Sequence, residues 1–178
     1  DLDPVGVLPG ARAGLGADLA DAARRLALVE PMPMRARLRE SSGLRVIEDC
    51  YNANPMSFAA ALEALVRCRN GSRAWVVAGD MRELGTASKE LHRRCGRRIA
   101  REGVNGLLAV GKFAEDLTRG AREGGMAADT VMTAATAEEA TEYARTLVRG
   151  GDLVLVKGSR ALGLETVVEA LLTCRRAA

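Results

Sequence analysis

The sequence has few aromatic residues and lacks long apolar runs. Phe, Trp and Tyr together make up 3% of the 178 residues, whereas hydrophobic residues make up 48%. A core of ordinary size is therefore expected to consist of Leu, Val, Ala and Ile. No run approaches the roughly 20 apolar residues of a membrane-spanning helix, and no basic–apolar–small signal segment is present. We therefore expect a cytoplasmic protein with no membrane partner.

Cysteine and histidine occur, but in no metal-binding pattern. The four cysteines, Cys50, Cys68, Cys95 and Cys174, form no CxxC pair, and His92 is the single histidine. A Cys/His zinc set is therefore excluded, and no metal site is predicted. The cysteines are expected to be reduced and mostly buried. His92 is expected at the surface or as a support for another residue, not as a catalytic group.

The charge balance does not indicate a nucleic-acid partner. The formal net charge is +3, which is too small to argue for nucleic acid by itself. Arginines concentrate in HRRCGRRIAR, where helical spacing places Arg93, Arg97 and Arg101 on one stripe with Arg94 and Arg98 beside it. A solvated helix face and a contact with an anionic partner are both compatible with this pattern.

The chain also lacks a self-sufficient catalytic motif. A GxSxG elbow, an HExxH helix and a recognisable Ser/His/Asp set are absent. GLLAVGKF matches the GxxxxGK spacing of a phosphate-binding loop, but Phe113 stands where a Ser or Thr hydroxyl is required. The two glycines also flank a predicted strand. The sequence therefore indicates ligand-binding loops without a catalytic centre of their own.

Apolar runs alternate with helical patterns from about residue 36 onward. A hairpin around SSG is predicted over 36–49, and Asn54 and Pro55 are expected to begin the helix 56–69. The remaining elements are strands at 73–79, 106–111, 129–133 and 152–158, and helices at 88–103, 112–125, 137–151 and 164–174. Continuous apolar strands indicate a sheet covered on both sides. The predicted class is α/β, a Rossmann-like doubly wound, mostly parallel sheet with helices on both faces.

The first 34 residues differ from this alternation. DLDPVGVLPG has no period and two prolines, a helix is expected near 17–29, and PMPM ends it. This piece resembles the tail of another unit, separated from the rest by a proline-containing hinge.

Polar residues follow several strands, at the edge where such sheets bind ligands. Asp80 in AGDMRELG either caps a turn or accepts hydrogen bonds from a ligand such as a ribose or an amine. In VKGSRA, Lys157, Ser159 and Arg160 precede a helix and suit a phosphate or a carboxylate. The alternative there is a capped helix with solvated Lys157 and Arg160.

Taken together, DCYNANPMSFAAALEAL, VVAGDMRELG, the ELH that follows and LVLVKGSRALGLETVVEAL resemble the C-terminal domain of the Mur ligases. The resemblance covers roughly residues 15–175. MRARL is similar to the family's hinge, with Arg37 in the arginine position, Ala36 in place of a glycine and Arg35 as a near alternative. Ala161 also stands where a glycine is common.

The resemblance implies a domain division and a reaction. Residues 1–34 would be the tail of a central ATP-binding domain and its hinge, and residues 35–178 the C-terminal domain. The enzyme's own N-terminal domain and the main part of the central domain would supply most contacts to ATP and Mg²⁺. The reaction would add D-Ala-D-Ala to UDP-MurNAc-tripeptide through an acyl phosphate, and this fragment alone would be inactive.

The resemblance also assigns site residues. Lys157, Asp80 and Ser159 are predicted as catalytic. A nucleotide-binding set is predicted at Arg37, Asp49, Tyr51, Asn52 and Asn54, and a substrate-binding set at Asp80, Ser159 and Arg160. Three alternatives remain open: a Mur ligase that adds a single amino acid, a stand-alone Rossmann-like module for a nucleotide or anion, and an interaction domain that uses the arginine face.

Overall fold

The computed structural model describes residues 32–173. The helix expected near 17–29, most of the expected tail-and-hinge segment, and Cys174 lie outside the described residues. No helix in the described part of the chain combines the length and apolar character needed to cross a bilayer.

The first two strands form the predicted hairpin. β1 (Arg37–Ser41) pairs antiparallel with β2 (Leu44–Asp49). Ser42 and Gly43 connect them with φ values of 50° and 75°. A two-residue connection with positive φ at both positions matches the right-handed twist of the paired strands. Glycine suits the second position because it has no Cβ that would clash there.

The six strands form one sheet in the order β1-β2-β6-β3-β4-β5. β3 (Ala74–Gly79), β4 (Gly106–Val110), β5 (Val131–Ala134) and β6 (Leu153–Lys157) run parallel to β2, so only the edge strand β1 is antiparallel. The mostly parallel sheet predicted from the apolar runs is confirmed. The central position of β6 brings the last strand of the sequence between β2 and β3.

The helices follow the predicted alternation. They are α2 (Pro55–Cys68), α3 (Ser88–Arg101), α4 (Ala114–Glu123), α5 (Ala137–Leu147) and α6 (Glu165–Thr173). The largest difference from the predicted boundaries is the end of α5, which ends at Leu147 because Val148 turns to extended geometry at φ −85° and ψ 141°. Gly150 and Gly151 therefore lie in the connection to β6 and do not close the helix.

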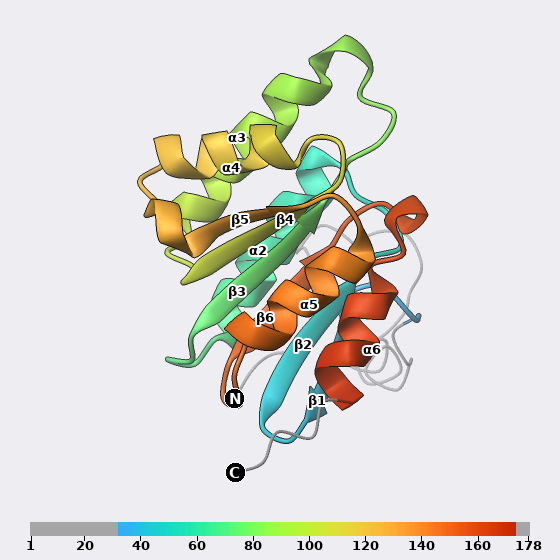
Figure 1. Ribbon diagram of the computed structural model, residues 1–178, viewed down its shortest axis with the longest axis vertical. Coiled ribbons are helices and arrows are strands. Elements are labelled where there is room, and N and C mark those ends of the chain that lie inside the picture. Colours follow the sequence, from blue (N-terminus) through green and yellow to red (C-terminus); the bar gives the residue numbers. More distant parts are fainter. Residues whose placement is uncertain (1–31, 174–178) are drawn as a thin grey trace, which may run out of the picture. The chain divides into compact units, whose positions relative to one another are not determined.

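Side chains that alternate along each strand supply two separate cores. Val76 and Ala78 of β3 pack with α2, α3 and α4, while Trp75 and Val77 pack with α5 and α6. Figure 1 shows α5 and α6 in front of the sheet and α2 behind it. The doubly wound arrangement is therefore present, and the cores are mainly aliphatic as expected.

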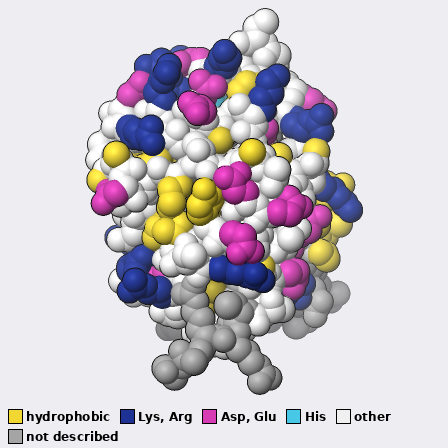
Figure 2. Space-filling view, viewed as in Figure 1, with side chains coloured by type: hydrophobic (Ala, Val, Ile, Leu, Met, Phe, Trp, Pro, Cys, Tyr) yellow, Lys and Arg dark blue, Asp and Glu magenta, His cyan; other side chains and the backbone are white. Residues whose placement is uncertain are grey.

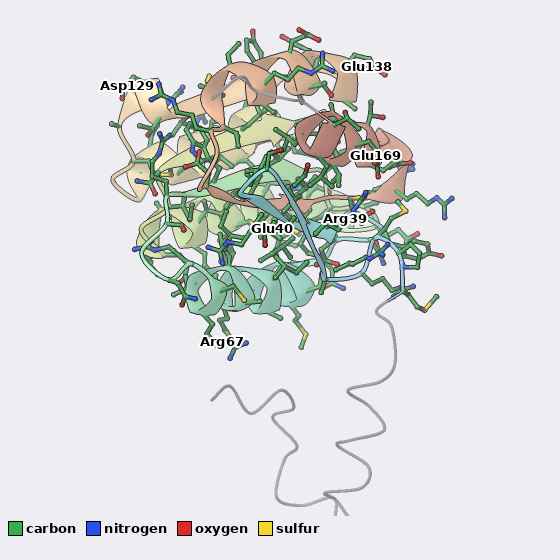
Figure 3. The ribbon with its side chains drawn as sticks, turned by 90° about the horizontal axis from the view of Figure 1, so that it is seen from below. Arg39, Glu40, Arg67, Asp129, Glu138 and Glu169 are labelled. Atoms are coloured by element: carbon green, nitrogen blue, oxygen red, sulfur yellow. The ribbon has the colours of Figure 1, made fainter. Side chains whose placement is uncertain are left out.

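The edge strand β1 is held to α6 by charge. The Arg39 guanidinium donates to both carboxylate oxygens of Glu169, and it lies 3.6 Å from the Glu48 carboxylate on β2. Figure 3 labels Arg39 and Glu169 on these two elements. The hydrogen bond to Arg39 lowers the pKa of the Glu169 carboxyl below its ordinary value. Because β1 pairs on one side only, this contact helps to fix the edge of the sheet.

Helices α3 and α4 meet through two glycines. A Cβ built on Gly96 would lie 2.0 Å from the carbonyl oxygen of Leu117, and one built on Gly120 would lie 1.9 Å from that of Arg93. Neither carbonyl oxygen can move without shifting its helix. The two glycines therefore allow the backbones of α3 and α4 to approach more closely than any side chain would permit.

Gly96→Ala is expected to lower the free energy of unfolding by about 1–3 kcal/mol, because the added methyl group forces the two helices apart. Urea unfolding of the variant measures this loss. Lys89→Ala, an exposed change on the same helix, serves as the control and should stay within about 0.5 kcal/mol of the parent. Since alanine favours a helix over glycine, a stabilised Gly96→Ala variant would contradict the close contact.

The described cysteines are free thiols, and two of them are buried. Desolvation by burial is the main cause that raises the pKa of both Cys50 and Cys95 to about 12. Cys68 is only partly buried. In a Cys174→Ser background, iodoacetamide at pH 8 should therefore label Cys68 well before the other two, because the thiolate is the reactive form. Mass spectrometry that finds Cys50 or Cys95 modified as fast as Cys68 in the folded protein would refute this.

Candidate functional site

Three adjacent parallel strands end at one edge of the sheet, and each end carries a polar residue. β2 ends at Asp49 and β6 at Lys157, and these two residues are register partners. β3 lies on the other side of β6, with Ala78 opposite Lys157, and Asp80 follows directly after it. The carboxyl edge at which the sequence predicts ligand-binding residues therefore has Asp49, Lys157 and Asp80 on neighbouring strands.

Lys157 is buried and paired with Asp49. The Lys157 side chain is 1% exposed, and its Nζ lies 2.6 Å from Asp49 Oδ2 and 3.0 Å from the carbonyl oxygen of Asn52. The Phe58 ring lies beneath the ammonium, with its centroid 5.6 Å away. A buried ammonium requires such partners because burial removes its hydration. The alternative of a solvated Lys157 is therefore wrong, and its charge is balanced before any ligand arrives.

The Asp49 cavity lies beside this pair and measures about 250 Å³. Its lining brings together several of the residues predicted to face a nucleotide. The lining residues are Arg35, Ala36, Asp49, Tyr51, Asn52, Asn54, Ser57 and Lys157.

Arg35, not Arg37, reaches this cavity. The Arg35 guanidinium lies 4.2 Å from the centroid of the Tyr51 ring, and that of Arg160 lies 5.6 Å from it. Arg37 is the exposed first residue of β1 and does not line the cavity. Ala36 between them has φ 49°, and its N–H donates to Asp49 Oδ1 at 3.3 Å. This turn directs Arg35 to the cavity, so the choice of Arg37 over Arg35 is not supported.

The side-chain oxygens of the two asparagines in the Asp49 cavity accept hydrogen bonds from backbone N–H groups close by in the sequence. Asn54 Oδ1 accepts from Ser57 N at 2.8 Å, and the Ser57 hydroxyl accepts from Asn54 N, which forms a capping box at the start of α2. Asn52 Oδ1 accepts from Ala53 N at 2.8 Å. Asn54 therefore begins the helix as predicted. Hydrogen bonding to the backbone fixes both side chains in place.

Asp80 holds three loops together. Its Oδ1 and Oδ2 accept from Phe113 N and Lys112 N at 2.9 Å each, just before α4 begins. The backbone oxygen of Asp80 accepts from Ser159 N at 3.0 Å. A carboxylate at the N-terminus of a helix is favoured by the helix dipole. The turn-capping alternative therefore describes the contacts of Asp80 in the structure.

The Asp80 cavity is larger, about 430 Å³. It contains the predicted residues Asp80 and Ser159, together with cationic and apolar residues that were not singled out as a set. The lining residues are Asp80, Met81, Arg82, Glu83, Leu84, Gly85, Ser88, Lys112, Phe113, Ser159, Ala161 and Leu162. Lys112 follows a predicted strand and so belongs to the predicted ligand-binding edge, but Lys112 and Phe113 were rejected as a phosphate-loop match and were not assigned to the site.

His92 is not at the surface. It is fully buried in α3, and its Nε2 lies 2.8 Å from Met81 N in the loop that lines the Asp80 cavity. The surface alternative for this residue is therefore wrong. The reason is that His92 lies on the face of α3 that packs against the sheet, as do Cys95 and Ile99.

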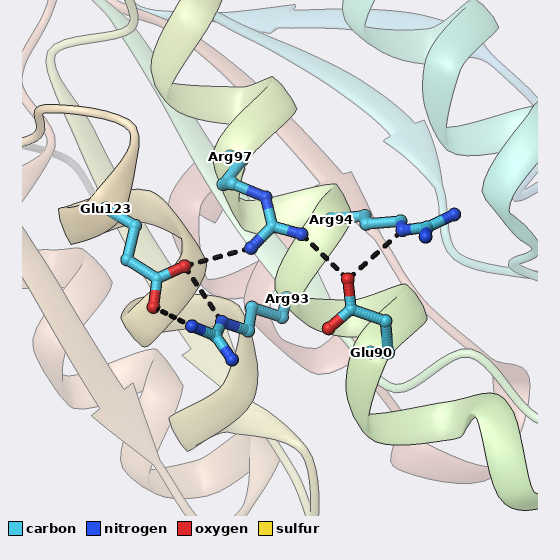
Figure 4. A network of polar contacts seen from close by, with 5 residues as sticks. All are labelled: Glu90, Arg93, Arg94, Arg97 and Glu123. Carbon is cyan, nitrogen blue, oxygen red and sulfur yellow. Dashed lines mark hydrogen bonds and ion pairs between the residues drawn. The ribbon is translucent and has the colours of Figure 1, made fainter.

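The arginine face of α3 is largely paired with carboxylates. Arg93 and Arg97 donate to Glu123 of α4, and Arg94 and Arg97 donate to Glu90 (Figure 4). Hydrogen bonds from the arginines lower the pKa values of both glutamate carboxyl groups. Basic and acidic side chains are interspersed over the visible surface in Figure 2. The geometry therefore favours a solvated, internally paired face over a site for an acidic partner.

Comparison with known proteins identifies the family of this chain. The family model described as "Mur ligase, glutamate ligase domain" matches residues 34–160. The chain belongs to the Mur ligase family. A relative named UDP-N-acetylmuramoyl-tripeptide–D-alanyl-D-alanine ligase, from Mycobacterium leprae, is 36% identical over 174 residues and aligns with 88% of this chain. The family resemblance carried by YNANP, AGDMRELG and KGSR is confirmed.

Solved Mur ligase structures share the fold. MurF from Acinetobacter baumannii matches with a TM-score of 0.76 at 29% identity over 89% of this chain. The MurF ligase from Thermotoga maritima in complex with ADP matches with a TM-score of 0.69 at 31% identity over 83% of this chain. The chain spans about a third of these proteins, namely 33% of the Mycobacterium leprae ligase, 35% of the Acinetobacter protein and 32% of the Thermotoga protein.

The Lys157–Asp49 pair is expected to behave as one unit in this Mur ligase domain. Lys157→Met should lower the free energy of unfolding by about 3 kcal/mol, because it leaves the Asp49 carboxylate without its buried partner. The double variant Lys157→Met/Asp49→Leu should lose less than the sum of the two single variants. Urea unfolding at pH 7 measures all three.

An exposed ion pair supplies the control for this cycle. Arg145 and Glu142 lie 3.4 Å apart with side chains 46% and 74% exposed, so their coupling should stay below about 1 kcal/mol. Additive losses at Lys157 and Asp49, as for two independent surface charges, would show that the buried pair does not act together.

Proposed function

We propose that this chain is the C-terminal domain of an ATP-dependent ligase that adds D-Ala-D-Ala to UDP-MurNAc-tripeptide during synthesis of peptidoglycan precursors. The observation that carries the proposal is the 36% identity, over most of the chain, to a ligase named for these substrates. The two cavities at one edge of the sheet support it, because such a ligase must bring a nucleotide and an amine to the same place.

The Asp49 cavity is proposed to face the nucleotide. Arg35 and Arg160 flank Tyr51 and would supply positive charge to phosphate oxygens. Asn52 and Asn54 would offer amide groups for polar contacts with ribose or base. Lys157 would act with Asp49 as a neutral pair that holds the Asn52 backbone, so its predicted catalytic role becomes one of positioning. The ADP complex named for the Thermotoga relative is consistent with a nucleotide here.

The Asp80 cavity is proposed to receive the incoming dipeptide. A zwitterionic dipeptide needs cations for its carboxylate and an acid for its ammonium group. Arg82 and Lys112 would supply the cations, and Glu83 the acid. Both oxygens of the Asp80 carboxylate already accept backbone hydrogen bonds, so Asp80 would shape the cavity. Ser159, also in its lining, would contact the reacting groups.

The described part of the chain provides no cluster of metal-ligating side chains for Mg²⁺. Residues 32–173 contain no group of three or more His, Cys, Asp or Glu side chains that could hold a metal ion, and Asp49 is occupied by Lys157. We therefore place the metal on the central domain of the proposed enzyme and assign no step to it here.

The proposed enzyme would work by closing this domain over the central one. Residues 1–34 would form the tail of the central domain and the hinge, and residues 35–178 the closing domain. Closure would exclude water from the acyl phosphate, which hydrolyses readily. The 178-residue chain alone would then bind ATP weakly and form no product.

Phosphate release by the full-length enzyme tests this proposal. Turnover is expected with ATP, UDP-MurNAc-tripeptide and D-Ala-D-Ala, and not with single amino acids in place of the dipeptide. Inertness with D-Ala-D-Ala alongside turnover of one amino acid would assign the chain to another Mur ligase. Inertness with every amine, combined with nucleotide binding by the 178-residue chain itself, would favour a stand-alone binding module.

Lys112→Ala in that enzyme is expected to raise the KM for D-Ala-D-Ala about tenfold or more, because a charge-assisted hydrogen bond to the carboxylate is lost. The KM for ATP should change less than twofold. Lys89→Ala removes a charge outside both cavities and is the matched control. Equal dipeptide KM values for the two variants would remove Lys112 from the proposed site.

A further inference from the structure

His92 bonds through both ring nitrogens to the backbone. Nε2 lies 2.8 Å from Met81 N, and Nδ1 lies 2.6 Å from the carbonyl oxygen of Ser88. The Met81 amide can only donate, so Nε2 must accept. The Ser88 carbonyl can only accept, so Nδ1 must carry the proton. These contacts are satisfied together by one form of the ring, the neutral Nδ1–H tautomer.

The same ring also contacts the other wall of the Asp80 cavity. The His92 and Phe113 rings stack with centroids 4.5 Å apart and an interplanar angle of 23°. Phe113 N in turn donates to Asp80 Oδ1. Met81 and Phe113 both line the cavity, whereas His92 does not. His92 therefore lies behind the lining and connects the loop after β3 with the loop before α4.

We propose that His92 is a positioning residue, which in its neutral Nδ1–H form fixes the Met81 and Phe113 walls of the Asp80 cavity and thereby sets the affinity for the amine substrate. The identity of that substrate rests on the proposed function. The positioning itself rests only on the contacts of the ring. His92 touches no reacting group in this proposal and acts through the residues that do line the cavity.

Protonation would remove the contact with Met81, because a second N–H on the ring would then face the Met81 N–H. Burial is the main cause that lowers the pKa of His92 below its ordinary value. The Ser88 carbonyl and the carboxylates of Asp80 and Asp116 act in the opposite direction. As the pH falls, the His92 ring of the unfolded chain binds a proton near pH 6.5, whereas that of the folded chain binds it only at a lower pH. The contribution of neutral His92 to the free energy of unfolding is therefore complete above about pH 6.5 and decreases as the pH falls.

Amide hydrogen exchange in the 178-residue chain tests the positioning without any assay of activity. His92→Leu fills similar volume but offers no acceptor, so exchange at the Met81 amide should accelerate at least tenfold. His92→Gln can present its Oε1 to the same amide and should restore most of the protection. Ile99→Val, another buried change in α3, is the control. The Met81 amide should exchange more slowly in this variant than in His92→Leu. Equal protection in His92→Leu and Ile99→Val would overturn the proposal.

Kinetics of the full-length enzyme test the consequence. His92→Leu should raise the KM for D-Ala-D-Ala about tenfold while the KM for ATP stays within twofold, and His92→Gln should remain within threefold of the parent for both. The parent's dipeptide KM should rise at acidic pH as His92 in the folded enzyme binds a proton, which its lowered pKa places below the ordinary range of a histidine, and the His92→Gln variant should lose that dependence. If His92→Leu fails to fold, the pH profile of His92→Gln still decides the question.

The possible failures can be told apart. A parent enzyme that does not use the dipeptide refutes the proposed function, while the exchange result at Met81 still tests the positioning. An unchanged pH profile in His92→Gln, or equal rises in the KM values for dipeptide and ATP in His92→Leu, would overturn the role of His92 in an enzyme that does turn over.

Discussion

The buried ammonium of Lys157 is the constraint on which the Asp49 side of this domain depends. A charge at 1% exposure requires an opposite charge and a hydrogen-bond acceptor, and both come from β2 and the turn that follows it. Because Asp49 is committed to this pair, the turn through Asn52 is held against the end of β6. The Asp49 carboxylate and the Asn52 backbone, on one side of the Asp49 cavity, are thus held in place by Lys157. That is why we assign Lys157 to positioning although its sequence context suggested a free cation.

On the Asp80 side of the domain, hydrogen bonds to backbone groups take the place of the ion pair. The Asp80 carboxylate accepts two N–H groups before α4, and its carbonyl accepts one from the loop after β6. His92 supports this arrangement from behind through Met81 and Phe113. The close approach of α3 and α4, allowed by Gly96 and Gly120, places the helix that carries His92 next to the helix that Asp80 caps. The packing of α3 against α4 therefore contributes to the shape of the Asp80 cavity.

Much of the fold was predictable from local patterns. Continuous apolar strands, Asn54 before Pro55 and the SSG connection led to the correct elements, because each reports on the burial or capping of its own segment. The end of α5 was misplaced since Gly150 and Gly151 suit several kinds of turn. The burial of His92 was also missed, although His92 lies three and seven residues before Cys95 and Ile99 and so shares the apolar face of α3. Arg35 and Arg37 likewise differ only in how the chain turns at Ala36, where φ is 49°.

The sequence by itself determined the family, the alternation of strands and helices, and the set of polar residues at the strand ends. These properties depend on residue type and spacing along the chain, so they can be read without coordinates. Only the tertiary structure decided which of those residues meet. The order β2-β6-β3 pairs Lys157 with Asp49, and the loops after β3 and β4 bring Asp80 to Lys112 and Phe113. Contacts between residues that are about 30 to 110 positions apart follow from strand order and packing. A local sequence pattern predicts neither of these.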